Sequence, residues 1–257
     1  MKPLISSPWS RQPLTTPAKL TRIFTPIIAA LAGFSVQMAP ASAQQNPVVV
    51  ELFTSQSCSS CVPATHVFND LATRDDLVVL SWHVDYWNDL QTREGRWKDP
   101  YSSAAYTERQ RVYNQDIRGR ASVYTPQAVI AGSAETVGSS RAKIERMIED
   151  QRITPTNAIT TQANANQKIG IGIDPSDINV DAYLIRLVRE AQTDVRGGEN
   201  AGVDFYERNI VASMKHLGTV RREARSFVVN APAQSETCAI IVENPRTGRI
   251  VSAQYCP

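Results

Sequence analysis

The chain has 257 residues, with 27 basic and 25 acidic side chains and a hydrophobic fraction of 42%. Four of the basic residues and none of the acidic ones lie in residues 1–43, so the rest of the chain has 23 bases against 25 acids, a net charge of about −2. This balance excludes the strongly basic surface that proteins bound to nucleic acid or to anionic membranes carry. The size suits one large domain or two small ones.

Residues 1–43 have the pattern of a secretory signal peptide. Scattered basic residues precede an apolar run at 23–36, and the stretch Ala41-Ser42-Ala43 is a typical cleavage signal. The apolar run is shorter than the ~20 residues that a membrane span needs. We therefore expect cleavage after Ala43 and a periplasmic or secreted protein with no membrane span after cleavage.

Residues 47–84 predict a strand, a helix and a second strand. The runs PVVVELF (47–53) and DLVVLSWHV (76–84) are dense in β-branched and apolar residues, as buried strands are. Between them, apolar residues recur at helical spacing from Val62 to Ala72. Cys58 and Cys61 therefore stand where the first strand meets the helix.

Residues 86–151 predict an insertion of about residues 86–123 and then a second group of elements. The predicted elements are a helix at 101–117, a strand at 124–132, its short hairpin partner at 134–137 and an amphipathic helix at 139–151. Thr125-Pro126 stands at the start of the strand.

Beyond residue 155 the pattern becomes rich in strands. Pro155 and the polar run at 160–167 predict a boundary between a domain at 46–155 and a β-rich domain at 156–257. Strands are predicted at 168–174, 179–188, 225–231, 238–244 and 249–255, and NPRTG (244–248) is a hairpin turn signal.

The four cysteines predict two disulfides, which is the default for an exported chain. Pairing neighbours in sequence joins Cys58 to Cys61 and Cys238 to Cys256. The second pair flanks the predicted hairpin, whose two ends come together, so we expect it to form a structural disulfide.

The spacing of Cys58 and Cys61 fits a redox-active pair, half of a zinc site or a structural disulfide. So short a loop constrains the unfolded chain little, which makes it a poor structural staple. Zinc needs four ligands, and no second close pair of cysteines exists. A helix N-terminus favours a thiolate, so we expect Cys58 to attack and Cys61, one turn further, to be more buried and to resolve the mixed disulfide.

The order of strand, C-x-x-C, helix, strand and Thr-Pro is that of thioredoxin. There the proline is cis and packs beside the cysteines, and Thr125-Pro126 holds that place in this chain. The extended backbone at Thr125 would bind a client peptide in the manner of a strand.

Three polar residues extend the predicted site. Glu51 is either a buried carboxylate with a raised pKa that moves the proton of Cys61, as thioredoxins use, or a side chain facing solvent on an edge strand. His83 and Asp85 follow a strand parallel to the one that leads to the cysteines, so all of them meet at one sheet edge. Two sulfurs with one imidazole suit Cu(I), and the alternative for His83 is a structural role.

Several longer motifs are similar to an exported bacterial thioredoxin-like family that is catalogued as a domain of unknown function. They are VELFTSQSCSSCVPA, WHVDYWN, RWKDPYSSAAYTERQRVYN, YTPQAVIAG and GENAG, and the resemblance covers residues 46 to about 250. It implies a thioredoxin-like N-terminal domain and a β-rich C-terminal part. The matched site positions are Cys58, Cys61, His83, Asp85, Trp87 and Pro126.

This chain departs from the family pattern at a few positions. Ser57 stands where the family has glycine, Val62-Pro63 where it has two prolines, and the turn NDLQTREGRWKD is longer. Cys238 and Cys256 lie outside the pattern.

We therefore expect an α/β protein, a thioredoxin-like domain with a helical insertion followed by a β-rich C-terminal region. The predicted function is that of an exported thiol–disulfide oxidoreductase that acts on protein thiols and disulfides without a cofactor or nucleic acid. One alternative is a non-enzymatic thioredoxin-fold binding module that uses residues 86–123 as a partner surface. The other is a copper-handling chaperone that uses Cys58, Cys61 and His83.

Overall fold

The computed structural model describes residues 46–152, 157–164 and 166–257. The predicted signal peptide and Pro155 lie outside these residues. The described residues belong to one compact unit with a mixed α/β fold. Among the described residues, no helix has the length and apolar composition needed to cross a membrane.

The first half of the chain forms the predicted strand, helix and strand. Strand β1 (Val48–Thr54) leads into a short 3-10 turn, η1 (Ser59–Cys61), and then into helix α1 (Val62–Leu71). Strand β2 (Leu77–His83) returns beside β1 and pairs with it in parallel over all seven residues. All residues of β1 and β2 are buried, which explains their nearly continuous apolar sequence.

The next elements also match the predictions closely. Helix α2 (Ala104–Arg118) begins after Ser103, whose hydroxyl accepts a hydrogen bond from the Ala105 amide. Strands β3 (Gln127–Ile130) and β4 (Ala134–Val137) form an antiparallel hairpin, and β3 pairs antiparallel with β1. Helix α3 (Arg141–Asp150) follows.

The rest of the chain is made of strands. They are β5 (Ile159–Asn164), β6 (Lys168–Ile173), β7 (Val180–Asp194), β8 (Asp204–Val220), β9 (Arg225–Asn230), β10 (Glu236–Glu243) and β11 (Ile250–Tyr255). Strands β5, β6 and β9 form a separate three-stranded sheet, and the other four join the strands of the first half.

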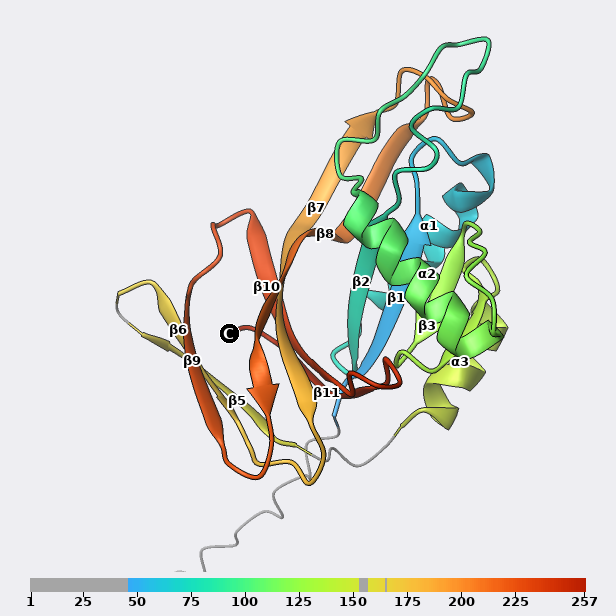
Figure 1. The fold of residues 1–257 in the computed structure, drawn as a ribbon. Coiled ribbons are helices and arrows are strands. Elements are labelled where there is room, and N and C mark those ends of the chain that lie inside the picture. The colour runs from blue at the N-terminus through green and yellow to red at the C-terminus, as the bar shows by residue number, and fades with distance from the viewer. Residues whose placement is uncertain (1–45, 153–156, 165) are drawn as a thin grey trace, which may run out of the picture. The chain divides into compact units, whose positions relative to one another are not determined.

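One eight-stranded sheet contains strands from both halves of the chain, in the order β11-β10-β7-β8-β2-β1-β3-β4 (Figure 1). The halves meet where β8 runs parallel to β2 and Ile210 pairs with Ser81. The division of the chain near residue 155 that the sequence predicted is therefore not a division of the main sheet.

Strand β8 has no counterpart among the predicted elements. It is 17 residues long, and its burial follows no regular alternation because exposed and half-buried side chains interrupt the apolar ones. The register shifts twice along its pairing with β7, so inward and outward positions change places within the strand. Strand β5 was also missed, because its polar sequence was interpreted as a boundary.

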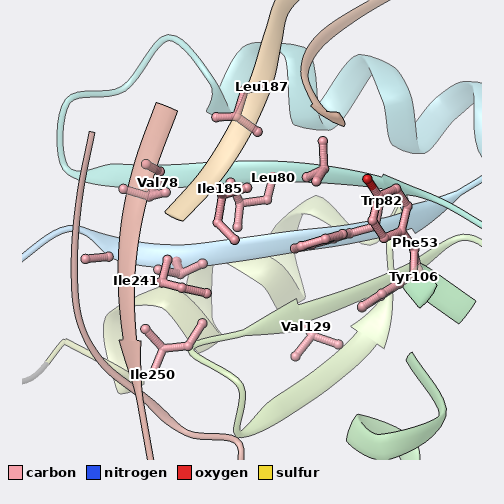
Figure 2. Close-up of a cluster of buried hydrophobic side chains, with 14 of the residues drawn as sticks. Phe53, Val78, Leu80, Trp82, Tyr106, Val129, Ile185, Leu187, Ile241 and Ile250 are labelled. Carbon is pink, nitrogen blue, oxygen red and sulfur yellow. The ribbon is translucent and has the colours of Figure 1, made fainter. Parts of the chain in front are cut away.

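Three apolar clusters hold these layers together. The first cluster lies between one face of the main sheet and α2, and it includes Trp82, Tyr106 and Ile241 (Figure 2). The other face packs against α1 and α3 in the first half of the chain and against the three-stranded sheet in the second half. The main sheet is therefore covered on both faces.

The second disulfide is the one that the sequence predicted at the ends of a hairpin. Strands β10 and β11 pair antiparallel, and Cys238 and Cys256 form a disulfide with a Cα–Cα distance of 5.2 Å. The Cys256 amide also donates a hydrogen bond to the Cys238 carbonyl at 2.7 Å. This bond ties the last strand to the sheet.

Replacing both cysteines with alanine (C238A/C256A) should lower the free energy of unfolding by about 3 kcal/mol, because the bond closes a loop with a sequence separation of 18. Urea unfolding of the oxidised proteins measures the difference. A loss below about 1 kcal/mol would show that the hairpin is held without the bond.

Candidate functional site

The Cys58–Cys61 disulfide lies where β1 meets α1. The two Cα atoms are 5.3 Å apart, and Cys58 stands just before the 3-10 turn that starts the helix. Neither cysteine has any exposed surface. The sequence predicted that Cys61 would be the more buried of the two, and this is wrong because other segments cover Cys58 equally well.

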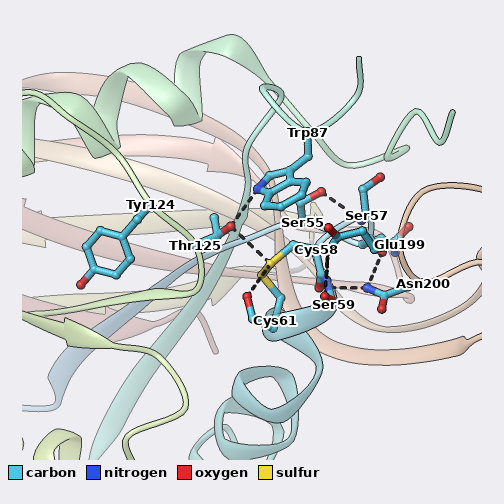
Figure 3. Close-up of a disulfide and its surroundings, with 12 residues drawn as sticks. Ser55, Ser57, Cys58, Ser59, Cys61, Trp87, Tyr124, Thr125, Glu199 and Asn200 are labelled. Atoms are coloured by element: carbon cyan, nitrogen blue, oxygen red, sulfur yellow. Dashed lines mark hydrogen bonds between the residues drawn. A yellow bond between two sulfur atoms is a disulfide. The ribbon is translucent and has the colours of Figure 1, made fainter. Parts of the chain in front are cut away.

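Two hydroxyl groups lie against the sulfur of Cys58 (Figure 3). Ser60 Oγ and Thr125 Oγ1 are each 3.3 Å from Cys58 Sγ. Trp87 Nε1 donates a hydrogen bond to Thr125 Oγ1 at 2.8 Å, which leaves the Thr125 hydroxyl hydrogen directed to the sulfur. The Thr125-Pro126 bond is cis, as the sequence predicted.

The loop between β7 and β8, residues 195–203, crosses the segment that carries Cys58, and we call it the strap. Glu199 Oε2 accepts hydrogen bonds from Ser59 N at 2.9 Å and from Ser59 Oγ at 2.7 Å. Asn200 Nδ2 donates to the carbonyls of Gln56 and Cys58, each at 2.9 Å. The strap therefore supplies a carboxylate and an amide to the residues on both sides of Cys58.

Glycine permits this close approach of the strap. Gly198 has a φ of +73°, and a Cβ there would lie 2.8 Å from Ser57 Oγ. The Glu199 amide donates to the Ser57 carbonyl at 3.3 Å. The motif GENAG, at residues 198–202, was the one signal in the sequence that pointed to this segment.

A buried group of charged side chains lies behind the loop that precedes Cys58. His83 Nδ1 is 2.8 Å from Asp99 Oδ2, and His83 Nε2 is 3.3 Å from Glu207 Oε1, at an angle that makes no hydrogen bond. His83 has no exposed surface, and the two carboxylates are at most 3% exposed. Burial by itself opposes charge on the imidazole, but the Coulomb attraction of Asp99 and Glu207 outweighs it and raises the pKa of His83 to about 10.

Gln56 connects this charged group to the cysteine loop. Its backbone amide donates to Asp99 Oδ2 and its side-chain amide donates to Glu207 Oε2, both at 2.9 Å. Burial raises the pKa of Asp99, but the charge of His83 and the hydrogen bonds from His83, Gln56 and Tyr101 together outweigh it, and the net direction is down. Since Gln56 stands two residues before Cys58, the group holds the loop in place.

The geometry of His83 does not fit the predicted copper site. Both ring nitrogens face carboxylates rather than the cysteines. Within the described part of the chain, no group of three or more His, Cys, Asp or Glu side chains is arranged to hold a metal ion. Asp85 lies apart from the disulfide and accepts a hydrogen bond from the Thr107 hydroxyl of α2 at 2.6 Å.

Glu51 is buried, which agrees with the first of the two alternatives predicted for it. Its hydrogen-bond partners, however, are not the cysteines. Its carboxylate accepts hydrogen bonds from Arg109 Nε at 2.9 Å and from the Tyr113 hydroxyl at 2.6 Å, both on α2. Arg109 also lies 3.2 Å from Glu243. Burial raises the pKa of Tyr113 well above its usual value.

The alternation of side chains along β1 explains this placement. Val49 and Phe53 pack in the cluster that includes α2, whereas Val50 and Leu52 pack against α1. Glu51 shares the parity of Val49 and Phe53 and therefore faces α2, on the opposite side of the sheet from the helix that carries Cys61. The proton-transfer role predicted for Glu51 has no contact to support it among the described residues.

The site therefore contains residues to which the sequence assigned no role. These are Gln56, Asp99 and Glu207, together with Glu199 and Asn200 of the GENAG motif. Their partners lie far away in sequence, from 16 positions for Asp99 and His83 to 151 positions for Gln56 and Glu207. A pattern based on local spacing has no way to find them.

We predict that His83 stays protonated well above neutral pH. Its pKa in the folded state, about 10, exceeds the ordinary value of 6.5, so the stabilisation is complete below pH 6.5 and is lost as the pH rises through 10. The variant H66N/H216N leaves His83 as the single histidine, and NMR titration of its ring then reports it directly. A midpoint near 6.5 would contradict the ion pairing.

Two solved structures show what the fold of this chain is similar to. A crystal structure of a protein from Agrobacterium tumefaciens is similar with a TM-score of 0.69 and 26% identity, over 83% of this chain and 95% of that one. HBP35 of Porphyromonas gingivalis shares the fold with a TM-score of 0.56 at 11% identity, over 82% of this chain and 74% of that one.

The search of curated proteins found no match. Residues 49–243 match the family described as "Protein of unknown function (DUF1223)", a match that includes most of β1, the cysteine pair and all of β10. The chain belongs to this family of proteins of unknown function.

Proposed function

We propose that the protein is an exported thiol–disulfide oxidoreductase with a thioredoxin-like site, in which Cys58 and Cys61 are the redox pair. The observation that carries the proposal is the placement of two hydroxyl groups, from Ser60 and Thr125, at 3.3 Å from the sulfur of Cys58. Hydroxyl donors stabilise a thiolate, because hydrogen bonds to the charged form favour it. They mark Cys58 as the attacking residue.

The order and pairing of the elements support the thioredoxin-like part of the proposal. Strand β1, helix α1 and the parallel strand β2 are followed by the antiparallel hairpin of β3 and β4 and by helix α3. The cysteines stand at the carboxyl end of β1, where ligands and active sites of parallel strands lie. Two disulfides in one chain support an oxidising compartment and so the proposed export.

The proposed reaction is the oxidation of a client dithiol. A client thiolate attacks Cys58 Sγ, the Cys58–Cys61 bond breaks, and Cys61 leaves with the electron pair and takes up a proton. The second client thiolate attacks the client sulfur of this mixed disulfide, which forms the client disulfide and releases Cys58 as a thiolate. Two electrons pass to the cysteine pair, and the reverse sequence reduces a client disulfide.

The burial of both sulfurs adds a requirement to this reaction. A client thiolate has no path to Cys58 in this conformation, because Cys58 has no exposed surface. Exchange therefore needs a transient displacement of groups that contact Cys58, such as Thr125 or the strap. We expect small thiols to react faster than folded clients.

The same burial favours a second candidate, a non-enzymatic binding module that keeps the disulfide for structure. Against it stands the sequence separation of three between the cysteines, since so short a loop stabilises a fold little. Catalytic turnover separates the two functions.

In the turnover assay, the oxidised protein with dithiothreitol should accelerate the reduction of insulin, and the C58S variant should fall to the uncatalysed rate because the attacking sulfur is gone. The matched control is C238A/C256A, which lacks the other disulfide and should keep the wild-type rate. A wild-type protein that does not exceed the background rate would favour the binding module.

The two hydroxyl contacts also predict where the Cys58 thiol titrates. In the reduced protein, S60A and T125V should each raise the pH midpoint of Cys58 alkylation by about one unit, since each loses a hydrogen bond to a charged acceptor. Iodoacetamide rates with mass-spectrometric site assignment measure the midpoint. The S226A variant, which changes an exposed serine of β9 in the three-stranded sheet, is the control, and equal shifts in all three would contradict the assignment.

A further inference from the structure

We propose that Glu199 is a positioning residue that makes the Cys58 thiolate less stable and the Cys58–Cys61 disulfide harder to reduce. The inference rests on the proposed redox role of the pair and assigns the residue that adjusts it. It is carried by the position of one carboxylate on the strap relative to the residue that follows Cys58.

The carboxylate of Glu199 is held in place by two donors of a single residue. Ser59 N and Ser59 Oγ donate to the same oxygen, Oε2, at 2.9 and 2.7 Å. The Glu199 backbone amide donates to the Ser57 carbonyl. The strap thus contacts Ser57, before Cys58, and Ser59, after it (Figure 3). The negative charge of the strap, on Glu199, lies against Ser59.

Ser59 is the first residue of the turn that opens into α1, so its amide is one of the free donors at a helix N-terminus. Such donors and the positive end of the helix dipole are what stabilise a thiolate in this position. Glu199 already accepts the Ser59 hydrogen bond and brings a negative charge. The Ser59 amide is therefore not free to donate to a Cys58 thiolate, and the carboxylate of Glu199 repels that thiolate.

The buried charged groups near this segment are paired among themselves. The charged side chains beside the strap, Arg96 and Arg196, are exposed, and Arg196 pairs with Asp194. Asp99 and Glu207 face His83, and Asp99 also accepts from the Gln56 amide. Tyr124, next to Thr125, bonds to Glu135, away from the cysteines. Among the charged side chains of the described residues, Glu199 is the one that hydrogen-bonds a residue of the 58–61 segment.

The redox chemistry makes the effect depend on pH. Dithiothreitol loses two electrons and two protons as its own disulfide forms, and the cysteine pair takes up the two electrons. Below the pKa of Cys58 the pair also takes up both protons. Above it Cys61 takes one, the other goes to the solvent, and Cys58 remains a thiolate. Only in the second case does the charge of Glu199 act on a product of the reaction.

The test compares E199Q with the wild type. Glutamine keeps an oxygen that accepts from Ser59 and removes the charge. The pH midpoint of Cys58 alkylation should fall by about half a unit, and the equilibrium constant for reduction by dithiothreitol should rise about threefold above that midpoint. Since Glu199 is exposed, both changes should shrink in high salt.

Two further variants make the result specific. E199K reverses the charge and should shift the midpoint further in the same direction. E223Q removes a charge at an exposed position between β8 and β9 and should shift nothing. The thermal unfolding midpoint of each oxidised variant shows whether the fold is intact.

An unchanged alkylation midpoint in E199Q would overturn the inference. So would an equilibrium change of equal size below and above the midpoint, because a strap that merely holds the loop closed acts at every pH. These measurements use dithiothreitol and iodoacetamide alone. A protein that shifts as expected here but does not reduce insulin would keep this inference and refute the proposed enzymatic function.

Discussion

The parallel contact between β8 and β2 is the constraint on which the rest of the structure depends. It is short, with Ile210 opposite Ser81, and side chains reinforce it. The Asn69 amide on α1 donates to the Tyr206 carbonyl at 2.7 Å, and its oxygen accepts from the Arg208 amide at 3.0 Å. Asn209 follows within β8 and has a φ of 52°, which asparagine tolerates better than most residues.

This contact brings the second half of the chain to the cysteines. Strand β8 carries Glu207 into the charged group around His83, and the loop before it carries Glu199 and Asn200 to Ser59 and Cys58. The disulfide is therefore covered by a segment more than 130 residues away in sequence. A redox pair built in this way depends on the whole sheet and not on the strand–helix unit alone.

Local sequence patterns were sufficient to predict an element where all of its residues are buried or where one regular face of it is buried. The strands β1 and β2 and the hairpin of β10 and β11 were predicted from nearly continuous apolar runs, and the helices α1 and α3 from apolar residues at helical spacing. Strand β8 was missed because its two shifts of register disrupt that period. The face that Glu51 occupies was also beyond local patterns, since alternation predicts two faces but does not say which helix covers each.

The sequence by itself determined the two cysteine pairs, the strand–helix–strand order around the first pair, and the place of Thr125-Pro126, because each depends on residues near one another in the chain. The tertiary structure alone decided that both sulfurs are buried, that His83 is paired with carboxylates, and that Glu51 faces α2. These outcomes depend on contacts between residues such as Gln56 and Glu207, 151 positions apart. Such contacts form only after the sheet has joined the two halves of the chain.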